Sequence, residues 1–150
     1  MPKKISDAAR SEMMKSIRAC DTGPELIVRR GLHSLGYRYR IYPSSIIGKP
    51  DLVLRKWNVA IFIHGCFWHA HSGCKYFRMP KTRTLFWQRK LSENTFRDSK
   101  VIASLQSSGW RIAIVWECSL RRNSNETISI IDRFLTSKEA FIEIPSSTDN

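Results

Sequence analysis

Apolar residues recur at helical spacing in the first part of the chain. Residues 3–20 place methionine and isoleucine side chains on one face between basic residues, which predicts a short amphipathic helix or arm. A second helix is predicted over residues 21–35, because Pro24 is tolerated in a first helical turn and Glu25 suits the positive end of a helix. We expect Gly36 to end this helix.

Shorter apolar runs follow and predict strands. Residues 37–42 alternate aromatic and basic side chains, as an edge strand does. Residues 51–54 and 59–64 form two apolar runs separated by four residues, which most simply make a hairpin. The predicted sheet is therefore antiparallel at this point, and a further buried strand is predicted over residues 110–116.

Two more helices are predicted, over residues 84–107 and 126–138. Gly109 ends the first of them, and residues 145–150 are expected to form a disordered tail. The inner face of the first helix is expected to carry Leu91, Val101, Ile102 and Leu105. This order of elements indicates an α/β fold around a mixed sheet, in a single domain of residues 1–150.

The formal charge of the chain, +12, is concentrated in its first 122 residues. Residues 123–150 contribute −3, so the rest of the chain carries +15. Between Lys75 and Lys100, eight basic residues face two acidic ones, with aromatic residues interleaved. Such a surface suits phosphates and stacked bases and indicates a nucleic-acid partner, although a solvated helix face has the same pattern.

The apolar content, 42% of residues, is that of an ordinary folded domain. The longest apolar run, over residues 59–63, is strand-sized and far shorter than a membrane span. The first twelve residues are charged and carry no apolar signal region. These features exclude a transmembrane role and predict a cytoplasmic chain that joins the nucleoid when it is bound to DNA.

Four cysteine and histidine side chains have the spacing of a metal site. Cys66, His71 and Cys74 form C-x4-H-x2-C, and Cys118 directly follows the strand predicted over residues 110–116. Four such donors fit tetrahedral Zn²⁺, and a site closed by four protein ligands is structural. The alternatives are two disulfides or separate buried thiols, of which disulfides are disfavoured in a reducing compartment. His69 lies in the same loop and is assigned to its other face.

Asp51 follows Pro50 at the start of a predicted strand, where it places a carboxylate at the edge of the sheet. Alone it could simply cap the strand. However, an acid in a helix first turn, then Pro-Asp, then a paired strand is the order of the PD-(D/E)xK nuclease core, whose acids hold Mg²⁺. The second strand of that core should supply (D/E)-x-K, but residues 59–64 contain neither acid nor lysine, which weakens this interpretation.

Four motifs resolve this conflict by their resemblance to a known family. They are GCFWHAH over residues 65–71, FW-x-x-K over residues 86–90, Arg97-Asp98, and GW-x4-VWEC over residues 109–118. From about Ser6 through Leu120, the chain resembles the very-short-patch mismatch-repair (Vsr) endonucleases. The resemblance implies a three-layer PD-(D/E)xK fold, a structural zinc and Mg²⁺-dependent nicking of DNA 5′ to the thymine of a T:G mismatch.

The resemblance also implies the partners of the chain and the ligands of the magnesium ion. The partner is double-stranded DNA with a T:G mismatch that arises when 5-methylcytosine deaminates, with mismatch-repair proteins as further partners of a monomeric enzyme. Mg²⁺ binds to the Asp51 carboxylate and to the backbone carbonyl of Ile63, where the family often has threonine. Glu25 and His64 hold waters bound to the metal and support the leaving group.

The remaining roles are carried over from the family residue by residue. His69 positions or deprotonates the attacking water, with Asp98 as its orienting partner. Phe67, Trp68 and Trp87 match an aromatic wedge that unstacks the mismatch. Core packing is the alternative for each ring, but for the adjacent Phe67 and Trp68 on a loop fixed by metal we favour the wedge.

The family also uses its N-terminal arm to contact DNA from the minor-groove side. Met14 lies in this arm, over residues 1–20, and its unbranched side chain suits insertion. The expected phosphate contacts are Lys15, Arg18, Lys81, Arg83, Arg89 and Lys90. Two alternatives stay open, namely a PD-(D/E)xK nuclease of another specificity, such as a restriction or junction-cleaving enzyme, and a zinc-stabilised DNA-binding module without catalysis.

Overall fold

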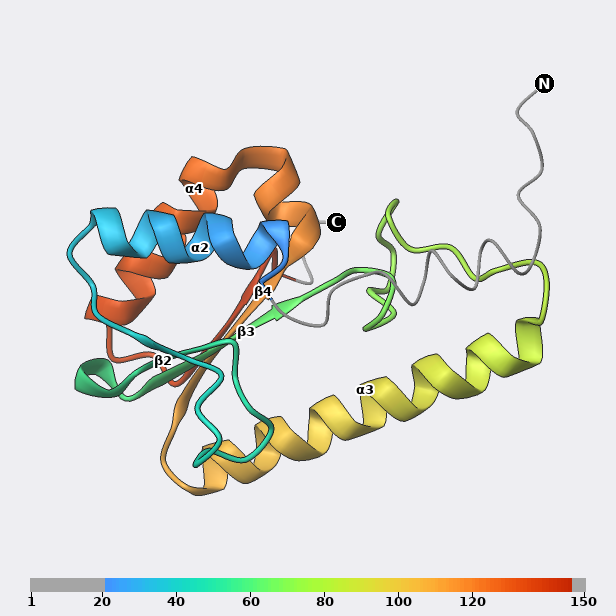
Figure 1. Ribbon diagram of the computed structural model, residues 1–150, viewed down its shortest axis with the longest axis horizontal. Coiled ribbons are helices and arrows are strands. Elements are labelled where there is room, and N and C mark those ends of the chain that lie inside the picture. The colour runs from blue at the N-terminus through green and yellow to red at the C-terminus, as the bar shows by residue number, and fades with distance from the viewer. Residues whose placement is uncertain (1–20, 147–150) are drawn as a thin grey trace.

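The computed structural model describes residues 21–146 and arranges them as a five-stranded sheet flanked by helices (Figure 1). The arm predicted over residues 1–20 lies outside the described part of the chain, as do residues 147–150. The helices are α2 (Gly23–Ser34), α3 (Thr84–Ser107) and α4 (Glu117–Thr136), and a 3-10 helix, η1, spans Arg55–Trp57. The strands are β1 (Arg40–Ile41), β2 (Leu52–Leu54), β3 (Val59–His64), β4 (Arg111–Trp116) and β5 (Phe141–Ile144).

The strands lie in the order β1-β2-β3-β4-β5, so the sheet is mixed, as predicted. β1, β2 and β3 are antiparallel neighbours, which confirms the hairpin, whereas β3, β4 and β5 are parallel. β3 and β4 are central and buried on both faces, which explains their continuous apolar sequences. In this register His64 lies opposite Trp116, so the last residues of the two central strands meet at one edge of the sheet.

Helices cover both faces of the sheet and create two hydrophobic cores. On one face α2 and α4 pack together, and Val28, Leu32 and Phe134 contribute to a core with β2, β3 and β4. On the other face Leu105 of α3 packs beneath Phe62 and the neighbouring strand residues. Figure 1 shows the N-terminal part of α3 extending beyond the sheet. The arrangement is a three-layer α/β fold.

The C-terminal part of the fold differs from the sequence prediction. The helix predicted over residues 126–138 is the second part of α4, which begins at Glu117 and is interrupted at Asn123, where the backbone is extended. The side-chain oxygen of Asn123 accepts a hydrogen bond from the Glu126 amide, so asparagine restarts the helix as a cap. A short edge strand, β5, follows and was not predicted, and the tail predicted from residue 145 begins directly after it.

Candidate active site

A cleft of about 760 Å³ opens where β3 ends, between the N-terminus of α2 and the middle of α3. All six residues to which the sequence assigned catalytic or magnesium-binding roles line it. They are Glu25, Asp51, Ile63, His64, His69 and Asp98. They come from two helices, the start of one strand, the end of another and the loop that follows, so the fold brings together residues up to 73 positions apart.

Asp51 directly precedes β2, at the floor of this cleft. The loop that leads to Asp51 passes close to α3 at Gly48. There φ is +78° and an added Cβ atom would lie 2.2 Å from the side chain of Val101, so the position requires glycine. The pKa of Asp51 is raised to about 7, mainly by burial and also by the nearby Glu25 carboxylate, although a hydrogen bond from the Ile63 amide opposes the shift. The carboxylate is thus held in a site where its negative charge needs a cation.

The backbone amide of Ile63 points toward the Asp51 side chain. It donates a 2.7 Å hydrogen bond to Oδ2 of Asp51. Since the N–H and C=O of one strand residue point to the same side, the carbonyl of Ile63 also points toward β2. β2 begins at Leu52, which pairs with Ile61, so this carbonyl lies beyond the last backbone pair and faces the cleft. The carboxylate and the carbonyl are hard oxygen ligands of the kind Mg²⁺ prefers.

Glu25 occupies the first turn of α2 and is buried, at 4% exposure. Its Oε2 accepts hydrogen bonds from the Asp21 amide (3.1 Å), from the Arg29 guanidinium (3.1 Å) and from the Tyr42 hydroxyl. Burial and the bond to Glu25 raise the pKa of Tyr42 to about 12. Sequence reasoning missed Arg29, which its spacing of four residues from Glu25 could have indicated, and Tyr42, for which the sequence carries no such signal.

Two histidines and an aspartate also line the cleft. Nδ1 of His69 lies 2.5 Å from Oδ2 of Asp98, which α3 presents to the loop after β3. Burial alone would raise the pKa of Asp98, but the hydrogen bond and the charge of His69 hold it below its usual range. The rings of His64 and His69 stack at 3.8 Å with an interplanar angle of 2°. Burial, with the charge of His69, lowers the pKa of His64 to about 3, so its ring is neutral.

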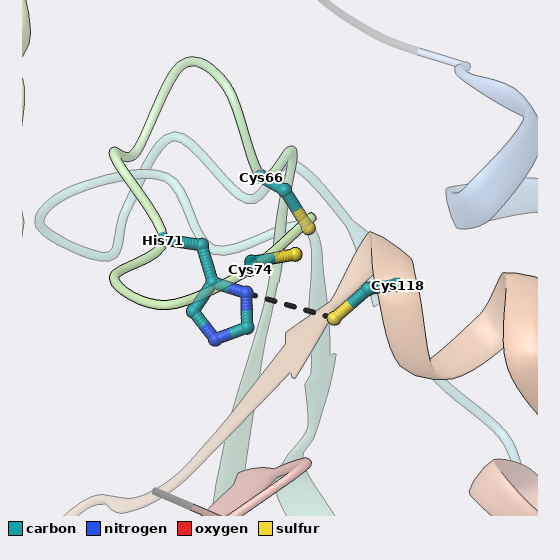
Figure 2. A group of neighbouring side chains, drawn as sticks. All are labelled: Cys66, His71, Cys74 and Cys118. Carbon is teal, nitrogen blue, oxygen red and sulfur yellow. Dashed lines mark hydrogen bonds between the residues drawn. The ribbon is translucent and has the colours of Figure 1, made fainter. Parts of the chain in front are cut away.

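A cluster of three cysteines and one histidine lies beside the cleft (Figure 2). Cys66, His71 and Cys74 come from the loop after β3, and Cys118 comes from the first turn of α4. One ligand atom from each residue lies within 4.8 Å of the other three, and Sγ of Cys118 is 3.5 Å from Nδ1 of His71. All three cysteines are free thiols, which excludes the disulfide alternative for them.

This cluster fits a thiophilic dication such as Zn²⁺. Ligand atoms around tetrahedral zinc lie about 3.3–3.8 Å apart, and Sγ of Cys118 and Nδ1 of His71 are within that range. Burial raises the pKa of the Cys66 thiol, and the neighbouring Cys118 raises it further, because adjacent thiolates repel one another in a desolvated site. A bound dication would remove that repulsion, so the donor set is one that a metal ion stabilises.

The aromatic residues of the expected wedge form one group. Phe67 and Trp68, on the loop after β3, are half-buried at the rim of the cleft, and Trp87 of α3 lies against both at 5.4 and 5.9 Å between ring centroids. Phe86, also on α3, extends the group at 5.3 Å from Trp87. The structure therefore brings the three expected rings together, at the end of the cleft nearest the exposed part of α3.

The basic residues expected to contact phosphates divide into two sets. Four of them, Lys81, Arg83, Arg89 and Lys90, are exposed around the start of α3. The Arg83 guanidinium lies 4.4 Å from the centroid of the Phe86 ring, so this cation borders the aromatic group. Arg89 forms an exposed pair with Glu93 at 3.4 Å. Met14, Lys15 and Arg18 lie outside the described residues.

None of the helices in residues 21–146 combines the length and the apolar character that spanning a membrane would require.

Comparisons with known proteins agree with the motifs. The family model for the DNA mismatch endonuclease Vsr matches residues 3–75. DNA mismatch endonuclease Vsr of Escherichia coli is 44% identical over 114 residues, which cover 76% of this chain and 72% of that protein. A type II nicking enzyme of Xanthomonas oryzae, V.XorIIP, is 41% identical over 120 residues, covering 80% and 88%. Another from Neisseria meningitidis, V.NmeAIP, is 42% identical over 120 residues, covering 80% and 85%.

Proposed function

Because the chain belongs to the Vsr family of DNA mismatch endonucleases, we propose that it nicks one strand of duplex DNA 5′ to the thymine of a T:G mismatch in a Mg²⁺-dependent reaction, and so initiates very-short-patch repair. The observation that carries the proposal is the convergence of three carboxylates and two histidines on one cleft, namely Glu25, Asp51, Asp98, His64 and His69. Glu25 on α2 and Asp51 before β2 follow the order expected of the acids in a PD-(D/E)xK core, and this order supports the proposal of that fold for the chain.

We assign the magnesium ion to the Asp51 carboxylate and the Ile63 carbonyl. A buried carboxylate whose pKa is about 7 gains from a dication, because the cation favours the ionised form that burial penalises. When bound, Mg²⁺ would polarise the scissile phosphate and stabilise the departing oxygen. Glu25 adds a second carboxylate to the cleft, held in place by Arg29 and Tyr42.

His69 is the proposed general base. Its Nδ1 faces Asp98 at 2.5 Å, so that nitrogen carries the proton and Nε2 is left to accept one from the attacking water. The Asp98 carboxylate then stabilises the imidazolium that forms. His64 is neutral and lies stacked on His69, from which position it supports the leaving group by donating a hydrogen bond.

Mismatch selection is assigned to the aromatic group at the rim of the cleft. A T:G wobble pair stacks poorly, so separating it from its neighbour costs less than opening a Watson–Crick pair. We assign insertion at that step to Phe67, Trp68 and Trp87, whose rings form one group. Met14 on the arm would enter from the minor groove. The phosphate contacts assigned to the exposed bases would come from Lys15, Arg18, Lys81, Arg83, Arg89 and Lys90.

The test is cleavage of three short duplexes that carry T:G, T:A or C:G at one position, in buffer with MgCl₂ and in buffer without divalent ions. We expect one nick, 5′ to the mismatched thymine, only in the T:G duplex and only with magnesium. Asp51→Ala is the control that should abolish nicking and retain binding. Equal nicking of all three duplexes would indicate a nuclease of another specificity, and binding without nicking would indicate a non-catalytic DNA-binding module.

A further inference from the structure

Trp116 lies between the cleft and the cysteine and histidine cluster. One face of its indole stacks on His71, at 3.9 Å between centroids and an interplanar angle of 5°. Its ring also meets that of His64 nearly at right angles, at 5.1 Å and 78°. The second contact follows from the sheet, since Trp116 and His64 are register partners on β4 and β3. One side chain therefore contacts a residue of each site.

The orientation of His64 depends on such ring contacts. Catalytic histidines are usually oriented by a hydrogen bond to the second ring nitrogen. Within residues 21–146, however, Nδ1 of His64 is buried with no hydrogen-bond partner, and the residue is only 6% exposed. What surrounds the ring instead is His69 on one face at 3.8 Å, with Trp116 and Phe62 against its edges at 5.1 and 6.1 Å.

The indole of Trp116 is itself fixed. Its Nε1 donates a 2.7 Å hydrogen bond to Oε1 of Glu143 on β5, and the residue is 8% exposed. Glu143 is aligned with Ile114 in the parallel pair of β4 and β5, so the acceptor is carried by the sheet and not by a loop. Rotating the indole would therefore break a buried hydrogen bond as well as both ring contacts.

We propose that Trp116 is a positioning residue that orients both His71 in the metal cluster and His64 in the cleft. A metal ion bound at the cluster then affects the orientation of the stacked His64–His69 pair. A dication that fixes His71 fixes the ring stacked on it, and the indole limits the rotation of His64. Because the His69 ring stacks on that of His64, the orientation of His64 determines that of His69. The proposal deepens the function proposed above and rests on it for its activity measurement.

The main experiment follows the imidazole ¹⁵N resonances of His64 and His71 in the full chain, with and without one equivalent of ZnCl₂. In the wild type we expect zinc to shift both sets of resonances. In Trp116→Leu we expect zinc to shift those of His71 alone, because the aromatic link is gone. Trp116→Phe keeps a ring at the position and should restore part of the His64 response.

Single-turnover nicking of a T:G duplex is the second measurement. We expect Trp116→Leu to slow the nicking step at least about tenfold with DNA affinity unchanged, because small displacements of catalytic groups are costly. The matched control is Trp57→Leu, which removes an indole that packs against Tyr37 at 5.8 Å in the other core. It should leave the His64 resonances and their response to zinc unaltered.

A second pair of variants covers the case in which Trp116→Leu does not fold. Glu143→Leu removes the acceptor of the indole N–H and should weaken the zinc response of His64, whereas Glu143→Gln retains an acceptor oxygen and should preserve it. A response of His64 to zinc that survives Trp116→Leu, or that survives Glu143→Leu where Trp116→Leu does not fold, would overturn the positioning role. If the resonances behave as expected but no variant, wild type included, nicks DNA, the proposed function fails and the positioning role stands.

Discussion

The amide of Ile63 donates a 2.7 Å hydrogen bond to the side chain of Asp51, at the point where the backbone pairing of β2 and β3 has ended. The Asp51 carboxylate thus accepts the next hydrogen bond after the backbone pairing of the two strands ends. This bond favours the ionised carboxylate, but burial outweighs it and raises the pKa of Asp51 to about 7. In the absence of a cation, ionisation of Asp51 therefore destabilises the folded protein.

The first prediction is that Asp51→Asn stabilises the metal-free protein at high pH. The folded pKa, about 7, lies above the ordinary value of 3.8, so the contribution of Asp51 to stability is complete below pH 3.8 and is lost as the pH rises through 7. In magnesium-free buffer we expect the substitution to raise the melting temperature by about 5 °C at pH 8. At pH 4.5 the gain should be much smaller, as measured by scanning calorimetry.

Glu93→Gln is the control for this experiment, because Glu93 is exposed on α3 and its substitution should have the same small effect at both pH values. MgCl₂ should stabilise the wild type at pH 8 and not Asp51→Asn. An equal gain from Asp51→Asn at pH 4.5 and pH 8 would contradict the burial of an ionisable carboxylate at this position.

The elements that frame the cleft are those with the strongest periodic signals. The residues of β2 and β3 lie in short, continuous apolar runs. α3 was bounded correctly because its apolar positions recur over 24 residues. The part of α4 before Asn123 was missed, since this polar residue, in extended conformation, interrupts the helix five residues after Cys118. β5 was missed because a four-residue edge strand is too short to show a period.

Within the cleft, sequence motifs indicated the residues that carry the chemistry but not those that hold them. Glu25 could be singled out from its helical turn, whereas Tyr42, which donates to it, arrives from a separate loop. Trp116 stood in a motif, yet only the register of β3 and β4 shows that it meets His64. Such partners are set by long-range packing, which a single sequence records only indirectly.

The second prediction concerns the pair of His69 and Asp98. Asp98→Asn should lower the single-turnover rate of T:G nicking by about 10²–10⁴-fold, because an amide can donate to Nδ1 and favour the wrong tautomer of His69. Binding of the duplex should change little. Ser99→Ala, one residue further along the same helix on its exposed face, is the matched control. A full nicking rate in Asp98→Asn would remove this carboxylate from the mechanism.

The third prediction is that the protein binds one zinc ion per chain at the Cys66, His71, Cys74 and Cys118 cluster. Cys118→Ser should lower zinc content and reduce the melting temperature by at least about 5 °C, because it removes a ligand that ties α4 to the loop after β3. Elemental analysis and calorimetry measure the two effects. Cys20→Ser, which changes a cysteine outside this cluster, should keep the full zinc content, and wild-type protein purified without stoichiometric metal would refute the site.

The last prediction separates wedge insertion from core packing at Phe67. The ring is half-buried and touches Trp68 and Trp87 at 5.2 and 5.4 Å, so its removal should cost the fold little, about 1 kcal/mol. If it enters the mismatch, Phe67→Ala should slow nicking of a T:G duplex by at least about tenfold, since stacking on a base is worth about 1–3 kcal/mol.

The readout for Phe67→Ala is 2-aminopurine placed beside the mismatch, whose fluorescence rises when the base is unstacked. The wild type should raise it and Phe67→Ala should not, at concentrations where both bind the duplex. Phe141→Ala on β5 is the control, because it removes an exposed ring from an element that does not line the cleft. If Phe67→Ala instead leaves the fluorescence rise intact and lowers the melting temperature by many degrees, the ring belongs to the core and the wedge must be assigned to Trp68 and Trp87.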